Sequence, residues 1–313
     1  MSSERPAGHQ TDTPPLDVRE GLSSRSFVCL VVAQALGTLN DNMFRWLAVP
    51  VATHMLGGTE HAKTAALSWG IFWFTLPYLL LPTHAGWLAD RFSKRSVIVW
   101  CKAAEIVVML LGIAAIFSAS AAWLFAALFL MGTQAALFAP SKFGSIPEIL
   151  RTDKLSAGNG IMAMVTVMAA AAGTVAGFEL FVATQPDGIH DIWITAVVLT
   201  AVGIAGWAAS LGIRPHPAGR PDYPMPKDPV TQNWKQLKLL ASHRSLMRAA
   251  LGIAFFYALA TLTQANIKLY GESVLHLDER NIGPLMLALV FGVGLGSVLA
   301  GIWSGGRVEL GIV

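Results

Sequence analysis

Long apolar stretches separated by short polar segments dominate the sequence. Eight of them, at about 27–54, 65–88, 97–117, 121–140, 157–183, 192–213, 249–270 and 282–303, are each near the roughly 20 residues that a helix needs to cross a bilayer. They are rich in Ala, Leu, Val and Gly and are too long for strands. A membrane barrel would instead show alternating segments of about ten residues. The pattern therefore predicts an all-α membrane protein.

Polar segments divide these stretches into groups. Residues 1–25 lack the apolar core of a signal peptide, so we expect a disordered tail there. Residues 26–213 hold six stretches, which predict a six-helix half. Residues 214–248 form the one long connection, and residues 249–313 hold two more stretches. We expect these last residues to begin a second, incomplete half, so that about eight of twelve transmembrane helices are present.

The connection at 214–248 changes character along its length. Its first part contains six prolines, which prevent a long helix. Its second part places Trp234, Leu237 and Leu240 at helical spacing, with basic residues nearby. An amphipathic helix at the lipid surface and a solvated linker are equally compatible with this pattern.

Composition narrows the class of protein further. Hydrophobic residues make up 54% of the chain and charged residues 13%, against roughly 25% charged in an ordinary soluble domain. These values exclude an ordinary soluble enzyme, a disordered protein and a disulfide scaffold. The net charge of +3 arises from basic residues between the apolar stretches. We therefore relate it to membrane topology and expect no nucleic-acid partner.

The basic residues also predict the orientation in the membrane. Seventeen Lys and Arg residues lie in the N-terminal tail and the connections after even-numbered stretches. The connections after odd-numbered stretches offer only Lys63 and Arg280. Because basic loops remain in the cytoplasm, we expect the N-terminal tail and the central connection at 214–248 to be cytoplasmic.

The sequence contains no recognisable catalytic constellation. Its eight histidines are scattered without the spacing of metal ligands, and no glycine-rich phosphate loop follows a strand. We therefore expect no enzymatic activity, no catalytic residue, no metal site and no cofactor. Transport driven by a coupling ion, H⁺ or Na⁺, or by the substrate gradient alone is compatible with this composition.

Charged residues inside the apolar stretches are the best candidates for function. Each costs at least about 2.5–3.5 kcal/mol unless it is paired or faces water. Asp41 and Arg45 are four residues apart on one helical face, where they could pair, and Asn40 and Asn42 flank the acid. This pattern favours a substrate or cation site that lines a cavity. A buried ion pair that only fixes packing is the alternative.

A second charged pair lies in the third stretch. Lys102 and Glu105 are three residues apart and share a face, within about two turns of the expected cytoplasmic end, where a lysine can snorkel to the interface. A role in substrate binding and a purely structural role are equally favoured by this position.

The run GWLADRFSKR at 86–95, between the second and third stretches, resembles the signature loop of the major facilitator superfamily. Its position, the six-helix half and the long central connection agree with that family. The resemblance implies a major facilitator type helical bundle. It also implies an electrostatic latch that lies outside the membrane and stabilises one gating state, formed by Gly86, Asp90, Arg91, Lys94 and Arg95.

A narrower resemblance involves LNDNMFR at 39–45, QAALFAPSKFGSIPE at 134–148 and AGNG at 157–160. Together they resemble the bacterial lysophospholipid transporter family, and equally the transporter half fused to an acyltransferase in some phospholipid-repair proteins. The resemblance covers about residues 25–313. It implies alternating-access transport of lysophospholipids, such as lysophosphatidylethanolamine, across the bacterial inner membrane. Membrane lipids and an acyltransferase, separate or fused, are the implied partners.

One part of the sequence departs from that family. We would expect an arginine in the seventh stretch to help hold an anionic headgroup, but Thr263, Gln264, Asn266 and Lys268 occupy that region. Gln264 and Gln134 join Asp41, its neighbours and the second charged pair as candidate substrate-binding residues.

Two other functions remain compatible with the sequence. The same fold could export a small drug or metabolite in exchange for protons. Alternatively, the chain could be a membrane domain that docks a fused phospholipid acyltransferase, in which case an acyltransferase or adenylate-forming domain would follow the last span.

The expected topology can be tested with reporter fusions. Reporters fused at Pro221 and at Gly188 should report opposite sides of the membrane, with Pro221 on the cytoplasmic side, because most basic residues flank the former and not the latter. The same compartment for both fusions would contradict the arrangement of spans.

Overall fold

The computed structural model describes residues 20–184, 192–226 and 228–276, with short helical pieces between 285 and 303. Every regular element in these residues is a helix. In chain order they are α1 (Arg25–Met55), α2 (Glu60–Leu80), α3 (Pro82–Arg91), α4 (Lys94–Phe117), α5 (Ala121–Ile149), the short 3₁₀ helix η2 (Thr152–Lys154), α6 (Leu155–Thr184), α7 (Ile192–Leu211), α8 (Pro229–Ser242) and α9 (Arg244–Ser273).

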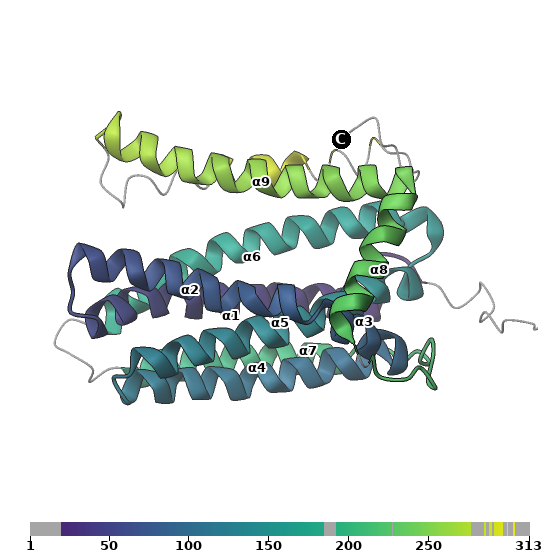
Figure 1. The fold of residues 1–313 in the computed structure, drawn as a ribbon, viewed down its shortest axis with the longest axis horizontal. Coiled ribbons are helices and arrows are strands. Elements are labelled where there is room, and N and C mark those ends of the chain that lie inside the picture. Colours follow the sequence, from purple (N-terminus) through teal and green to yellow (C-terminus); the bar gives the residue numbers. More distant parts are fainter. Residues whose placement is uncertain are drawn as a thin grey trace, which may run out of the picture.

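The helices α1 to α7 form one bundle of roughly parallel and antiparallel members (Figure 1). α1 packs against α6, α7 and α2, while α4 packs against α5 and α7, and α5 against α2 and α3. Five helices are long and apolar enough to cross a membrane, and the bent pair α2 and α3 makes a sixth. The prediction of an all-α membrane protein is therefore confirmed.

The second apolar stretch is not the single helix that we expected at 65–88. It is broken at Leu81 into α2 and α3, which meet at an angle of 54°. Pro82 explains the break, because it has no N–H to donate to the carbonyl of Tyr78 and its ring would clash with that carbonyl in a continuous helix. At the first position of a new helix, a proline is well accommodated.

The signature run at 86–95 is also mostly helical rather than a loop. Its first part belongs to α3, and Lys94 and Arg95 open α4, so that only Phe92 and Ser93 connect the two helices. α5 likewise continues to Ile149, well beyond the end that we expected at residue 140.

Residues 20–24, which we assigned to a disordered tail, are part of the folded chain. The Glu20 amide donates to the Ile149 carbonyl over 2.8 Å, and the Arg151 amide donates to the Glu20 carbonyl over 3.2 Å. The Ser24 hydroxyl accepts from the Phe27 amide and caps α1. The boundary at residue 25 is therefore too late, and the rest of the expected tail lies outside the described residues.

The proline-rich part of the central connection packs against α3. The Tyr223 carbonyl accepts two side-chain hydrogen bonds, from Trp87 Nε1 over 3.0 Å and from Arg91 Nη1 over 2.7 Å. The Arg220 amide donates to the Asp90 carbonyl over 2.8 Å. These bonds bring the central connection to the bundle end where α3 meets α4, as expected for segments on the same side of the membrane.

The second part of the central connection forms α8, which crosses the end of the bundle at a steep angle to the other helices (Figure 1). Thr83 bonds Asn233 and the Pro229 carbonyl and so ties α8 to α3. Trp234 and Leu237 are exposed. Of the two alternatives that the sequence left open here, the structure shows the helix. Its contact with lipid stays a prediction.

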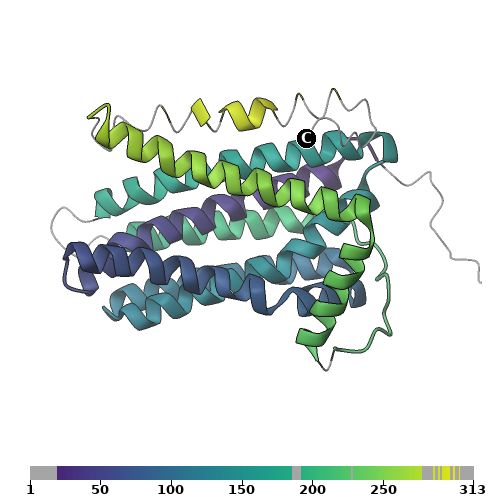
Figure 2. The same ribbon diagram turned by 45° about the horizontal axis from the view of Figure 1, so that its top comes forward.

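α9 follows α8 and runs along the outside of the bundle, as the two views show (Figures 1 and 2). Its 30 residues are enough for the seventh span that we expected at 249–270. The expected eighth span falls largely on residues outside the described part, as do the side chains of Gln264 and Lys268.

α1 and α6 approach closely because α6 carries Gly173 and Gly177. A Cβ atom at Gly177 would lie 3.1 Å from the Met43 Cα and closer still to its carbonyl oxygen. A Cβ atom at Gly173 would overlap the Leu39 carbonyl. Backbone atoms cannot move aside as a flexible side chain does, so only glycine fits at these two positions.

This contact predicts the effect of adding one methyl group. Gly177→Ala should lower the free energy of unfolding by about 1–3 kcal/mol, the usual cost of overpacking. Gly86→Ala is the matched control, because its added Cβ would have no neighbour within 4 Å and alanine favours the helix by about 1 kcal/mol. Thermal unfolding of the purified variants measures both, and equal melting temperatures would contradict the close approach.

Candidate functional site

A layer of polar side chains lies at mid-height in the bundle, between two apolar clusters. One cluster contains Phe27 and Ile98, and the other contains Phe44, Met109 and Leu128. On α1, α4 and α5 alike, the buried charged and amide side chains fall between the positions of these two clusters. They are Gln34, Asn40, Lys102, Glu105 and Gln134.

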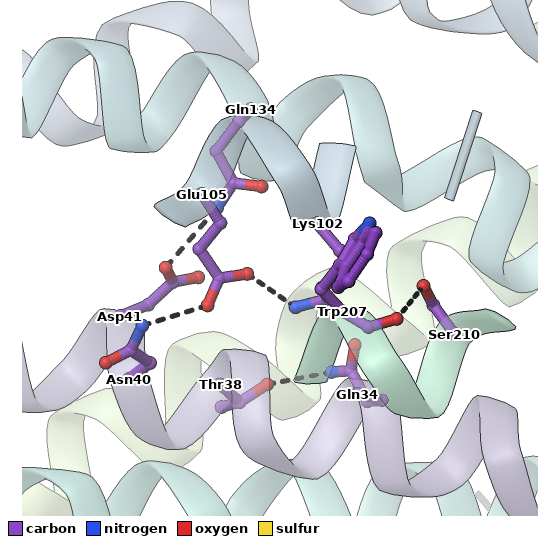
Figure 3. A network of polar contacts seen from close by, with 9 residues as sticks. All are labelled: Gln34, Thr38, Asn40, Asp41, Lys102, Glu105, Gln134, Trp207 and Ser210. Carbon is purple, nitrogen blue, oxygen red and sulfur yellow. Dashed lines mark hydrogen bonds and ion pairs between the residues drawn. The ribbon is translucent and has the colours of Figure 1, made fainter. Parts of the chain in front are cut away.

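The two charged residues of α4 form an ion pair inside the bundle. Lys102 Nζ lies 2.6 Å from Glu105 Oε2, and the side chains are only 3% and 1% exposed. Asn40 Nδ2 donates to the other carboxylate oxygen over 3.1 Å (Figure 3). The prediction that the two residues share a face is confirmed, and the structure shows in addition that they pair. The expectation that Lys102 snorkels to the interface is wrong, because its ammonium is neutralised within the bundle.

Asp41 and Arg45 share a face but do not form an ion pair within 4 Å. Gln134 Nε2 donates to Asp41 Oδ1 over 3.4 Å, so the carboxylate turns toward α5 (Figure 3). Arg45 Nη2 instead donates to Asn42 Oδ1 over 2.6 Å, and its guanidinium lies 5.2 Å from the centre of the Phe74 ring. The i, i+4 spacing allowed a pair, but the neighbouring amides and the ring supply closer partners.

Further amides anchor this part of α1. Asn42 Nδ2 donates to the Thr38 carbonyl over 2.8 Å, which orients its carbonyl oxygen toward Arg45. Gln34 Nε2 donates to the hydroxyls of Thr38 and Thr166, each over 2.9 Å. Since Thr166 belongs to α6, the polar layer reaches from α4 through α1 to α6.

Lys142 is a candidate that the sequence reasoning missed, because it was placed in a cytoplasmic connection. It belongs to α5, where its ammonium lies 5.6 Å from the centre of the Phe138 ring. Lys102 approaches the same ring to 5.0 Å. Gln134, Phe138 and Lys142 are spaced four residues apart, so all three lie on one helical face. This spacing was already visible in the sequence.

Three charges in this region lack an opposite charge within 4 Å among the described residues. They are those of Asp41, Arg45 and Lys142, whose side chains are half-buried. One carboxylate and two cations without ion partners suit a ligand that carries both signs of charge.

The five residues expected to form a gating latch make separate contacts. Lys94 pairs with Glu148 of α5, and Arg95 Nη2 donates to the Leu211 carbonyl at the end of α7 over 3.2 Å. Arg91 and the Asp90 carbonyl bond the central connection, as described above. The Cβ position at Gly86 has no neighbour. These contacts tie the ends of α3, α4, α5 and α7 together.

The polar layer is held together by contacts between its own side chains. Within the described residues, no group of three His, Cys, Asp or Glu side chains is placed to hold a metal ion. The charged side chains in and beside the layer contact amides and aromatic rings, and Lys102 and Glu105 also contact each other.

Comparison with known proteins agrees with the resemblance noted in the sequence. The profile of the Major Facilitator Superfamily matches residues 32–311. The chain is 24% identical over 279 residues to the lysophospholipid transporter LplT of Pectobacterium carotovorum, a match that covers 88% of this chain and 63% of that protein.

Two further relatives show the same range of similarity. The lysophospholipid transporter LplT of Escherichia fergusonii is 29% identical, over 72% of this chain and 50% of that protein. An uncharacterized MFS-type transporter of Bacillus subtilis, YceJ, is 27% identical, over 76% and 57% respectively. The chain therefore spans between half and two thirds of the length of these relatives.

Proposed function

This chain belongs to the Major Facilitator Superfamily, and we propose that it forms part of a secondary transporter that moves lysophospholipid across the bacterial inner membrane by alternating access. The names of the relatives support a transporter rather than an enzyme. The choice of lysophospholipid as the substrate rests on the charges of Asp41, Arg45 and Lys142.

The observation that carries this proposal is that Asp41, Arg45 and Lys142 have no opposite charge within 4 Å among the described residues. The headgroup of lysophosphatidylethanolamine presents one ammonium and one phosphate. In the proposed complex, Asp41 receives the ammonium, while Arg45 and Lys142 receive the phosphate. Arginine donates to phosphate in a forked geometry, and lysine acts as a point charge.

Aromatic side chains beside these charges suit the apolar part of the substrate. The Phe74 ring lies against the Arg45 guanidinium, and its centre is 5.9 Å from that of the Tyr78 ring. Tyr78 is 40% exposed, so this surface is accessible beside the charged groups. A single acyl chain can extend over such a surface while the headgroup contacts the polar layer.

The remaining parts of the proposal concern gating, coupling and orientation. The contacts of Arg91, Lys94 and Arg95 close one end of the bundle, and we assign their rupture to the opening of that end. Basic residues gather at this end, which we place in the cytoplasm. Asp41 is the acid to which we assign coupling to H⁺ or Na⁺. An acyltransferase that restores the second acyl chain is the partner that this substrate implies.

Replacing the central acid tests the proposal. Asp41→Asn preserves shape and removes the charge, so transport of lysophosphatidylethanolamine into vesicles should fall roughly 10- to 100-fold, the loss expected for a charge-assisted contact of about 1.5–3 kcal/mol. Asp153→Asn is the matched control, because Asp153 is 53% exposed at the surface. Full activity of folded Asp41→Asn would refute the assignment.

The two headgroup contacts can be separated with a second substrate. Lysophosphatidylglycerol has the phosphate but no ammonium group. Lys142→Gln should therefore impair uptake of both lipids, whereas Asp41→Asn should impair uptake of the ethanolamine lipid more than that of the glycerol lipid. Equal effects of the two variants on the two lipids in vesicle uptake would contradict the proposed pairing.

A further inference from the structure

Lys102 and Glu105 form the only ion pair between two buried side chains in the part of the chain that the structure describes. The other ion pairs there join side chains that are at least 15% exposed. Both oxygens of the Glu105 carboxylate are used, one by Lys102 and the other by Asn40. The pair is thus enclosed and satisfied, and it presents no free charge to a substrate.

The pair contacts α1 at two positions on one face. Asn40 donates to Glu105, and the Lys102 ammonium fills the space beside Gly37, where a Cβ atom would overlap it. Gly37 and Asn40 are three residues apart, so both lie on the side of α1 that faces α4. Figure 3 shows the ion pair of α4 lying over α1 at this height.

Two glycines of α7 complete the enclosure. A Cβ atom at Gly203 would lie 3.5 Å from Asn40 Nδ2, and one at Gly206 would lie 3.9 Å from Lys102 Cδ. The backbone of α7 therefore passes close to both polar groups. The Phe138 ring of α5 lies 5.0 Å from the Lys102 ammonium, so α5 borders the pair together with α1 and α7. The contact with α1 is made by hydrogen bonding and by shape.

A buried ion pair is weak evidence for stability, because apolar side chains of similar volume often stabilise as well or better. Apolar clusters lie on both sides of this pair along α4, so apolar packing is available at this interface. A hydrogen bond differs from apolar contact in that it fixes direction. Asn40 directly precedes Asp41, and successive residues of a helix are rotated by about 100°.

We propose that Lys102 and Glu105 are positioning residues, which fix the rotation of α1 through Asn40 and Gly37 and thereby orient Asp41 and Arg45 toward the substrate. This inference rests on the proposed function and replaces the direct contact with substrate that the sequence suggested for the pair. In this role the pair contacts α1 and does not contact the substrate.

The test compares two ways of removing the contact. The double variant Lys102→Met with Glu105→Leu removes both charges together, so that neither is left unpaired. Asn40→Leu keeps the ion pair and removes its bond to α1. Thr195→Val is the control, because the Thr195 hydroxyl is buried in α7 without a partner and its loss breaks no hydrogen bond.

Two measurements report on the rotation of α1 in these variants. The first is the KM and kcat of lysophospholipid uptake into vesicles. The second is a labelling rate and needs no substrate. Cys29 and Cys101 are first replaced by alanine, and Arg45→Cys is then introduced. The rate at which a water-soluble maleimide labels the cysteine at position 45 is measured. The melting temperature of each purified variant shows whether it is folded.

The double variant and Asn40→Leu should raise KM roughly tenfold or more, as displaced contacts of about 1 Å do elsewhere. The labelling rate at position 45 should change several-fold, while the melting temperature of the double variant stays near or above that of the parent. Thr195→Val should match the parent in every measurement. A merely structural pair would lower the melting temperature without changing KM in the folded fraction.

Parental KM and parental labelling in the folded double variant would overturn the positioning role. If the double variant does not fold, Asn40→Leu decides the question by the same two measurements. If the complete transporter that contains this chain does not take up lysophospholipid at all, the proposed function fails, and the labelling rates still show whether the pair sets the rotation of α1.

Discussion

Two charges enclosed in an apolar bundle have to be neutralised by each other, because neither reaches water. Lys102 and Glu105 meet this constraint with an ion pair whose side chains are at most 3% exposed. Their neighbours are arranged accordingly, with Gly37 giving space to the ammonium and Asn40 satisfying the second carboxylate oxygen. The packing of α1 against α4 and α7 therefore has to leave space for the ammonium and supply a donor to the carboxylate, in addition to burying apolar side chains.

A second group of charges, in this layer and on either side of it, is treated differently. Asp41, Arg45 and Lys142 are oriented by an amide or lie against aromatic rings, but none has an opposite charge within 4 Å in the described residues. A protein that needed these charges only for packing would pair them, as it pairs Lys102 with Glu105. Leaving them unpaired costs free energy, which the proposed substrate would recover on binding because its charges are complementary.

The bend at Pro82 has consequences beyond α3 itself. It turns α3 away from the line of α2, and the central connection packs on α3 through Thr83, Trp87 and Arg91. The connection that leads to α8 and α9 is thereby fastened to the first half of the bundle. Movement of the helices beyond it would be transmitted to α3 through these hydrogen bonds.

The sequence by itself determined the class of the protein, the positions of most helices and the residues worth examining. The length of an apolar stretch predicts a membrane-spanning helix, and a charged residue inside such a stretch indicates a functional site. Both features can be recognised in a short segment of the sequence. Only the tertiary structure decided which charges pair. The i, i+3 pair Lys102 and Glu105 formed, whereas the i, i+4 residues Asp41 and Arg45 took partners at Gln134 and Asn42. The role of Gly37 emerged in the same way, because its contact with Lys102 joins two helices and is specified by packing and not by spacing along one helix.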